Sequence, residues 1–155
     1  IGLNIASRAV ALGLEVIGWD PYATKVPCYV SLQPDFPGGR LCDCDFLILA
    51  CSLSEQSRHI INRHSLSKMR RGVRLINVSR GGLVDEVALI ESLESEMVSA
   101  AALDVFDEEP MGPNNALRNF EKCVFGSHNA SNTTDAVLRV SEQAIHLLWN
   151  MLDRY

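Results

Sequence analysis

The sequence has no long hydrophobic run and no extended basic cluster. Its longest strongly apolar stretch, residues 46–53, is far shorter than the ~20 residues needed to cross a bilayer, and we find no signal-peptide pattern. The largest basic group is Lys68, Arg70, Arg71 and Arg74 in a chain of net charge −5, whereas binding to a phosphate backbone needs concentrated positive charge. We therefore expect neither a membrane partner nor a nucleic-acid partner.

The sequence also lacks paired-cysteine motifs. Its five cysteines are an odd number, and no two of them form a C-x-x-C pair, which is typical of reduced thiols in a cytoplasmic protein. Cys42 and Cys44 are one residue apart, but no second ligand pair follows them. We therefore predict no metal site.

The composition indicates one soluble globular domain. The chain has 155 residues, of which 47% are hydrophobic and 21% charged, enough for a sizeable core without disulfides or metals. The pattern predicts helices at residues 3–12, 85–97 and 132–154, and strands at residues 14–20, 46–51, 73–78, 99–105 and 122–125. Strands that alternate with helices predict an α/β fold with a parallel sheet.

Two further segments carry structural predictions. The passage between the strands at 14–20 and 46–51 is rich in Pro and Gly, so we predict a surface loop there. The final helix is predicted to be capped by Asn132, with an acidic Asp135 three residues later. Its apolar positions form one stripe, which we expect to cover the sheet or a partner: Val137, Val140, Ala144, Leu147, Leu148 and Met151.

The beginning of the chain fits the second half of a dinucleotide-binding fingerprint. Ile1 and Gly2 run directly into a helix, whose amino terminus can receive a pyrophosphate, and Asp20 ends the next strand, where its carboxylate can accept hydrogen bonds from ribose hydroxyls. A negative charge at Asp20 favours NAD over NADP. The alternative is that Asp20 simply closes a strand before the turn at Pro21.

Three later motifs carry stronger evidence. A strand delivers Arg80 into a glycine pair, Asp104 and Glu109 follow the next strand, and His128 follows the last one. With spacings of 24, 5 and 19 positions between these four residues, nearly the whole chain resembles the NAD-binding domain of the D-isomer-specific 2-hydroxyacid dehydrogenases. Residues 126–129 and 19–22 partly resemble the phosphoglycerate-dehydrogenase-like sequences of that family.

The resemblance implies an enzyme that interconverts a D-2-hydroxy acid and its 2-keto acid with NAD. Arg80 would bind the substrate carboxylate, His128 would be the acid–base group, and Glu109 would fix the tautomer of that imidazole. The implied cofactor-binding residues, with Asp104 beside the nicotinamide, are Ile1, Gly2, Asp20, Cys51, Ser52, Val78, Ser79, Arg80, Asp104 and His128.

The resemblance also implies a Rossmann-type doubly wound sheet whose first strand, leading glycines and substrate domain lie before residue 1. We thus expect residues 1–155 to be a partial, single NAD-binding domain that is inactive when isolated, from a protein that forms a homodimer through it. Ser52 and Ser127 stand where the family usually has proline, which affects local loop shape only.

Alternatives to this interpretation remain. Each of the four polar residues could be an ordinary surface or strand-end residue. The same fold with the triad of Arg80, Glu109 and His128 also resembles the C-terminal-binding corepressors, which sense NAD(H) and hold protein partners. Formate dehydrogenase is disfavoured because it has Gln in place of Glu109. His59 and His64, in a predicted helical passage, and His146, on the last helix, have no comparable support.

Overall fold

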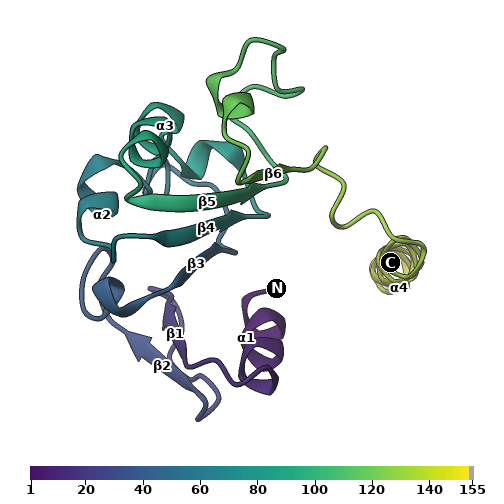
Figure 1. Ribbon diagram of the computed structural model, residues 1–155. Coiled ribbons are helices and arrows are strands. Elements are labelled where there is room, and N and C mark those ends of the chain that lie inside the picture. Colours follow the sequence, from purple (N-terminus) through teal and green to yellow (C-terminus); the bar gives the residue numbers. More distant parts are fainter. Residues whose placement is uncertain (154–155) are drawn as a thin grey trace.

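The computed structural model describes residues 1–153 and contains short parallel strands connected mostly through helices (Figure 1). The α-helices are α1 (Gly2–Ala11), α2 (Arg63–Ser67), α3 (Glu86–Glu94) and α4 (Thr134–Leu152). The strands are β1 (Val16–Trp19), β2 (Val30–Gln33), β3 (Phe46–Leu49), β4 (Val73–Asn77), β5 (Val98–Leu103) and β6 (Cys123–Phe125). Short 3-10 helices occupy η1 (Leu41–Asp43), η2 (Gly81–Leu83) and η3 (Ala116–Asn119).

The strands form two parallel sheets, which confirms the predicted α/β class. One sheet contains β1 and β2, and the other has the order β3-β4-β5-β6. The register places Leu75 of β4 between Leu47 of β3 and Ala101 of β5. In the described part of the chain β1 and β3 share no ladder, and the further strand expected from the fingerprint stays a prediction.

The core lies where the four-stranded sheet meets α2 and α3. In β4 the buried positions are Val73, Leu75 and Asn77, with Arg74 exposed between them, as the two-residue period of a strand requires. Leu66 of α2 and Leu89 of α3 are almost completely buried in the same cluster. This packing holds the carboxyl ends of β4 and β5 at one edge of the sheet, where ligands bind in doubly wound folds.

The structure corrects two predictions in the first half of the chain. The passage predicted to be a surface loop contains β2, which pairs in parallel with β1 from Val16 and Val30 onward. His59 does not lie in a helix, because α2 begins only at Arg63. Instead, His59 has a positive φ of 49° and lies in a turn.

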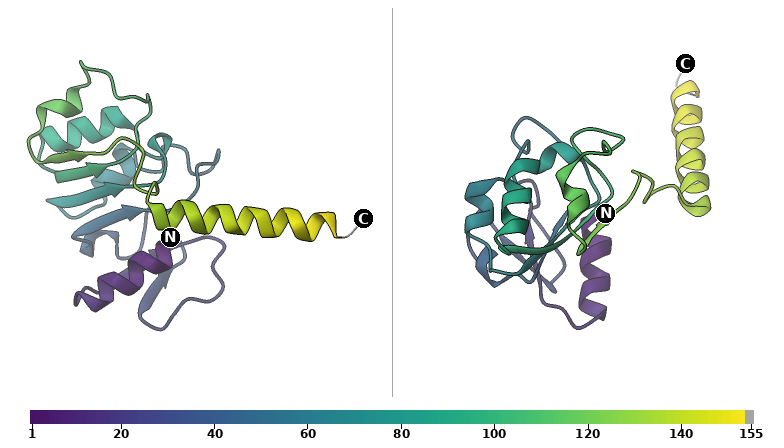
Figure 2. Two further views of the ribbon diagram at one scale, coloured as in Figure 1. Left: turned by 90° about the vertical axis from the view of Figure 1, so that its right-hand side faces the viewer. Right: turned by 45° about the horizontal axis from the view of Figure 1, so that its top comes forward.

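The final helix differs from the prediction in its cap residue and in its packing. The cap is Thr133 rather than Asn132, because the Thr133 hydroxyl accepts the backbone N–H of Ala136 at 3.2 Å. The predicted end at residue 154 lies outside the described residues. No residue of α4 is buried, and the helix projects away from the sheet (Figure 2), so its apolar stripe does not cover the sheet.

No helix within residues 1–153 combines the length and the apolar character needed to span a bilayer.

Candidate active site

Arg80 lies in a tight turn between the end of β4 and η2. Its backbone is extended, with φ −144° and ψ 141°, and its guanidinium Nη1 donates a hydrogen bond to the Ser79 carbonyl oxygen at 2.7 Å. A Cβ on the next residue, Gly81, would lie 1.9 Å from the carbonyl carbon of Phe106. Glycine therefore lets the Arg80 turn lie directly against the segment after β5 that carries Glu109.

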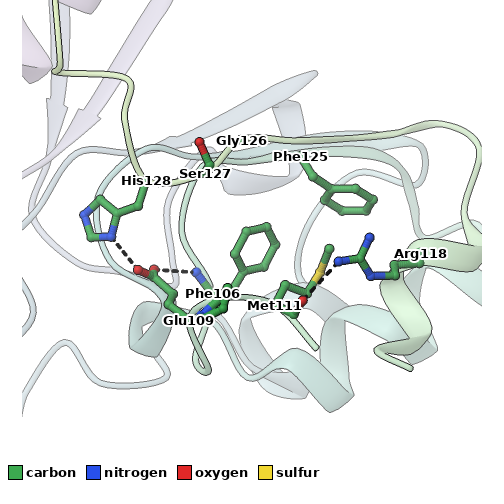
Figure 3. Close-up of a pocket in the computed structure, with 9 residues that line it drawn as sticks. Phe106, Glu109, Met111, Arg118, Phe125, Gly126, Ser127 and His128 are labelled. Atoms are coloured by element: carbon green, nitrogen blue, oxygen red, sulfur yellow. Dashed lines mark hydrogen bonds and ion pairs between the residues drawn. The ribbon is translucent and has the colours of Figure 1, made fainter. Parts of the chain in front are cut away.

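Glu109 and His128 are in direct polar contact at the site (Figure 3). Nδ1 of His128 lies 2.5 Å from Oε2 of Glu109, while Oε1 accepts the backbone N–H of Phe106 at 3.0 Å. The bond to His128 is the main reason that the pKa of Glu109 lies below its ordinary value. The Phe106 N–H and the positive charges of His128 and Arg80 act in the same direction, and burial opposes them.

The His128 turn is held by Asp104, the residue that follows β5. The backbone N–H of His128 donates to the Asp104 carbonyl oxygen at 2.8 Å, and the backbone N–H of Ala130 donates to Oδ2 of Asp104 at 3.0 Å. His128 has a positive φ of 57°. A Cβ on Gly126 would lie 2.1 Å from Oδ1 of Asp104, so the approach of the two segments requires glycine there.

A cavity of about 510 Å³ opens beside the Glu109–His128 pair. Figure 3 shows the aromatic rings of Phe106 and Phe125 in its middle, with His128 and Arg118 toward opposite ends. Arg118 donates to the carbonyl oxygens of Met111 and Gly112, both at 3.0 Å, and so holds the loop that forms this wall. Arg80 is not among the lining residues; its relation to the pair is electrostatic.

The residues predicted for the nicotinamide end and for the middle of the cofactor also come together. Val78 and Asp104 line a second, smaller cavity of about 140 Å³. The hydroxyl of Ser79 donates to the Cys51 carbonyl oxygen, which joins the ends of β4 and β3. Ser52, the next residue, accepts the Ser57 hydroxyl at 2.8 Å through its carbonyl oxygen.

The other end of the predicted cofactor site fits an adenosine and a pyrophosphate. Helix α1 has no side-chain cap and no acidic residue in its first turn, and the backbone N–H groups of such a helix amino terminus attract anions. Asp20 is exposed and follows β1, and its Oδ1 accepts the Tyr22 N–H at 2.9 Å. Burial raises the pKa of the nearby Cys51 thiol, with a smaller contribution from the charge of Asp20.

Sequence reasoning did not identify two residues that shape this site. These are Asn77, whose side chain bonds within the Arg80 turn, and the close-approach glycine Gly126. It noted the glycine pair after Arg80 but not the close approach of Gly81 to Phe106. The signal for Asn77 was a polar residue inside an apolar strand. Within residues 1–153 no group of three or more His, Cys, Asp or Glu side chains is placed to hold a metal ion.

Comparison with known proteins identifies the family. The model of the family described as "D-isomer specific 2-hydroxyacid dehydrogenase, NAD binding domain" matches residues 1–130. A hydroxypyruvate reductase of Thermotoga maritima is 38% identical over 159 residues, which cover 98% of this chain and 50% of that protein. A D-3-phosphoglycerate dehydrogenase of Methanocaldococcus jannaschii is 38% identical over 140 residues, which cover 88% of this chain and 26% of that protein.

Solved structures agree with the sequence comparison. An NADPH-dependent glyoxylate/hydroxypyruvate reductase of Sinorhizobium meliloti, in complex with NADP and sulfate, superposes with a TM-score of 0.88 at 27% identity, covering 98% of this chain and 49% of that one. A D-lactate dehydrogenase of Lactobacillus jensenii with NAD+ gives 0.84 at 27% identity, with coverages of 94% and 48%. The chain spans half or less of the length of these relatives. It belongs to the D-isomer specific 2-hydroxyacid dehydrogenase family, to whose NAD-binding domain residues 1–130 correspond.

Proposed function

We propose that this chain is the cofactor-binding half of an oxidoreductase that interconverts a D-2-hydroxy acid and its 2-keto acid. The observation that carries this proposal is the Glu109–His128 pair, 2.5 Å apart, beside the Arg80 turn. An acid–base group, a carboxylate that orients it and a cation for the substrate carboxylate are the parts that this reaction needs. The relatives named above are all dehydrogenases or reductases, which favours an enzyme over the corepressor alternative.

In this mechanism Arg80 binds the carboxylate of the keto acid and orients its carbonyl group. Nδ1 of His128 is engaged by Glu109, so Nε2 is the ring nitrogen that gives a proton to the carbonyl oxygen during reduction and takes it back during oxidation. Glu109 stabilises the imidazolium form by its charge and fixes the ring orientation. The nicotinamide cofactor, when bound, would supply the hydride for reduction and accept it in the reverse direction.

The remaining predicted residues would bind the cofactor. The uncapped start of α1 at Ile1 and Gly2 fits the pyrophosphate, and Asp20 fits the adenosine ribose and disfavours a 2′-phosphate. Two groups would follow the cofactor along the sheet edge toward the nicotinamide: Cys51 and Ser52 after β3, and Val78, Ser79 and Asp104 after β4 and β5. The helix amino terminus of α1 and the exposed carboxylate of Asp20 support this orientation.

The proposal extends to assembly and location. The exposed apolar stripe of α4, with Val140, Leu147 and Met151 each more than half exposed, supports a homodimer formed through this domain. The five free cysteines support the reducing cytoplasm as its location. Analytical ultracentrifugation of the full-length gene product is expected to give a dimer, and a monomer at micromolar concentration contradicts the assembly proposal.

Two histidine substitutions, one in the candidate site and one on α4, test the proposed activity. In the full-length gene product, His128→Ala should lower kcat for NADH-dependent keto-acid reduction by ~10²–10⁴-fold, with NADH affinity nearly unchanged, because acid–base help acts on the transition state. His146→Ala, on the exposed helix α4, is the control and should behave as the wild type. Equal kcat values for both variants would remove His128 from the mechanism.

A further inference from the structure

Asn77 is a buried polar residue at the carboxyl end of β4. Its exposed fraction is 1%, and it is one of two polar residues in the buried core of the described chain, the other being Ser65. Both atoms of the Asn77 amide are used within the turn that follows. Oδ1 accepts the backbone N–H of Ser79 at 3.1 Å, and Nδ2 donates to the carbonyl oxygen of Arg80 at 2.9 Å.

Only one orientation of the Asn77 amide satisfies both hydrogen bonds. A flipped side chain would point Nδ2 at the Ser79 N–H and Oδ1 at the Arg80 carbonyl, so that donor would face donor and acceptor would face acceptor. Because the site is buried, water does not replace the lost bonds. The amide therefore holds the backbone on both sides of the Arg80 turn in one geometry.

Asn77 is also connected to the His128 turn through its backbone. The carbonyl oxygen of Asn77 accepts the N–H of Asp104 at 3.0 Å, and the carbonyl oxygen of Asp104 accepts the N–H of His128 at 2.8 Å. Two residues thus link the turn that carries the expected carboxylate-binding cation with the turn that carries the expected acid–base group.

We propose that Asn77 is a positioning residue that fixes the Arg80 turn relative to the Asp104 and His128 segment. It touches neither substrate nor cofactor and acts through the backbone of Arg80. This inference rests on the proposed function for its kinetic consequence, because a displaced Arg80 weakens the binding of the keto-acid carboxylate. The hydrogen bonds on which it depends are independent of that function.

Asn77→Asp gives a signature that a loss of packing alone does not give. The Asp carboxyl has the shape of the amide, but when ionised it faces the Arg80 carbonyl oxygen with an acceptor. When protonated it donates to that oxygen as Nδ2 does, and burial favours the protonated form. The activity of Asn77→Asp relative to wild type should therefore rise as the pH falls, and division by the wild-type activity at each pH removes the pH dependence that both proteins share.

Ser65→Ala is a matched control. Ser65 is 0% exposed, and its hydroxyl also accepts one backbone N–H and donates to one backbone carbonyl, both of Asn62. It lies in α2 and takes no part in the candidate site. Its loss should reduce thermal stability without changing the KM for the keto acid.

The experiment compares these variants and Asn77→Ala in the full-length gene product. Asn77→Ala should raise the KM for the keto acid and lower kcat, with kcat/KM reduced by about 10-fold or more and NADH affinity unchanged. A kcat/KM within about twofold of wild type would overturn the inference. So would an activity of Asn77→Asp, relative to wild type, that does not change with pH.

Amide hydrogen exchange separates this inference from the proposed function. Exchange at residues 78–82 should accelerate in Asn77→Ala while residues 63–67 are unaffected, and Ser65→Ala should show the reverse. If the wild type reduces no keto acid with NADH, the proposed function fails, and exchange alone then decides whether Asn77 holds the Arg80 turn. Unchanged exchange at residues 78–82 would contradict the positioning role whether or not the protein is active.

Discussion

Replacing Gly81 with Ala should separate the two halves of the catalytic site. The added Cβ would lie 1.9 Å from both the carbonyl carbon and oxygen of Phe106, and 2.5 Å from the nitrogen of Asp107. Ordinary contact begins at 3.4 Å, so the two backbone segments must move apart by about 1.5 Å, the difference between 3.4 and 1.9 Å. The atoms that the Cβ would meet all belong to the backbone, so no flexible side chain can move out of the way instead.

The displacement should affect catalysis more than cofactor binding. Since Glu109 is bonded to the N–H of Phe106, it moves with that segment away from Arg80. A misplacement of ~1 Å can cost about 10²-fold, so we expect kcat/KM for the keto acid to fall by about that factor or more. Overpacking should also lower the free energy of unfolding by ~1–3 kcal/mol, measurable by thermal melting.

Gly82→Ala is the neighbouring control for this measurement. Its Cβ would meet only the far ends of Leu53 and Arg58, at 3.2 and 3.3 Å, and those side chains can shift. Steady-state kinetics should therefore show nearly wild-type kcat/KM for Gly82→Ala. The reasoning is refuted if Gly81→Ala folds and keeps kcat/KM within about threefold of the wild type.

Three other substitutions test single roles in the full-length gene product. Arg80→Ala should raise the KM for the keto acid as well as lower kcat, measured by initial rates, because the carboxylate is held before and during reduction. Glu109→Gln should lower kcat for keto-acid reduction, measured by initial rates, because a neutral amide replaces the carboxylate whose Oε2 lies 2.5 Å from Nδ1 of His128. Asp20→Ser should narrow the preference for NADH over NADPH, seen by fluorescence titration, since the carboxylate no longer repels a 2′-phosphate.

Local sequence patterns predicted most of the fold because the spacing of apolar residues and the helix-capping residues indicated the same elements. The strand containing Val73 and Leu75 alternates buried and exposed positions, and α3 begins just after Asp85, whose side chain caps it. The strand β2 was missed because it has only four residues, Val30–Gln33, in a segment bounded by Pro27 and Pro34. Its pairing with β1 is a long-range contact that no local pattern reports.

The final helix illustrates a second limit. Asn132 and Thr133 are adjacent and both are good cap residues, and the pattern alone did not distinguish them. The structure selects Thr133 because its hydroxyl reaches the Ala136 N–H. An apolar stripe such as that of Val140 and Leu147 predicts burial but not the surface that covers it, and α4 is exposed along its length.

The sequence predicted the charged residues of the candidate site but not the contacts that hold these residues in place. Arg80, Glu109 and His128 were named because their pattern resembles that of the 2-hydroxyacid dehydrogenases and their chemistry fits the reaction of that family, and the structure places Glu109 and His128 in contact. Asn77 and Gly81 act through backbone contacts with Arg80 and Phe106, which depend on how two distant segments meet. Such contacts require the tertiary structure.

The configuration of the product tests the central claim most directly. The full-length gene product should be incubated with NADH and a panel of 2-keto acids that give chiral products, such as pyruvate and hydroxypyruvate, and the 2-hydroxy acid formed should be resolved by chiral chromatography. The account predicts stoichiometric oxidation of NADH with formation of the D-2-hydroxy acid alone, abolished in His128→Ala. An L-2-hydroxy acid, or an absence of NADH-dependent reduction across the panel, would contradict it.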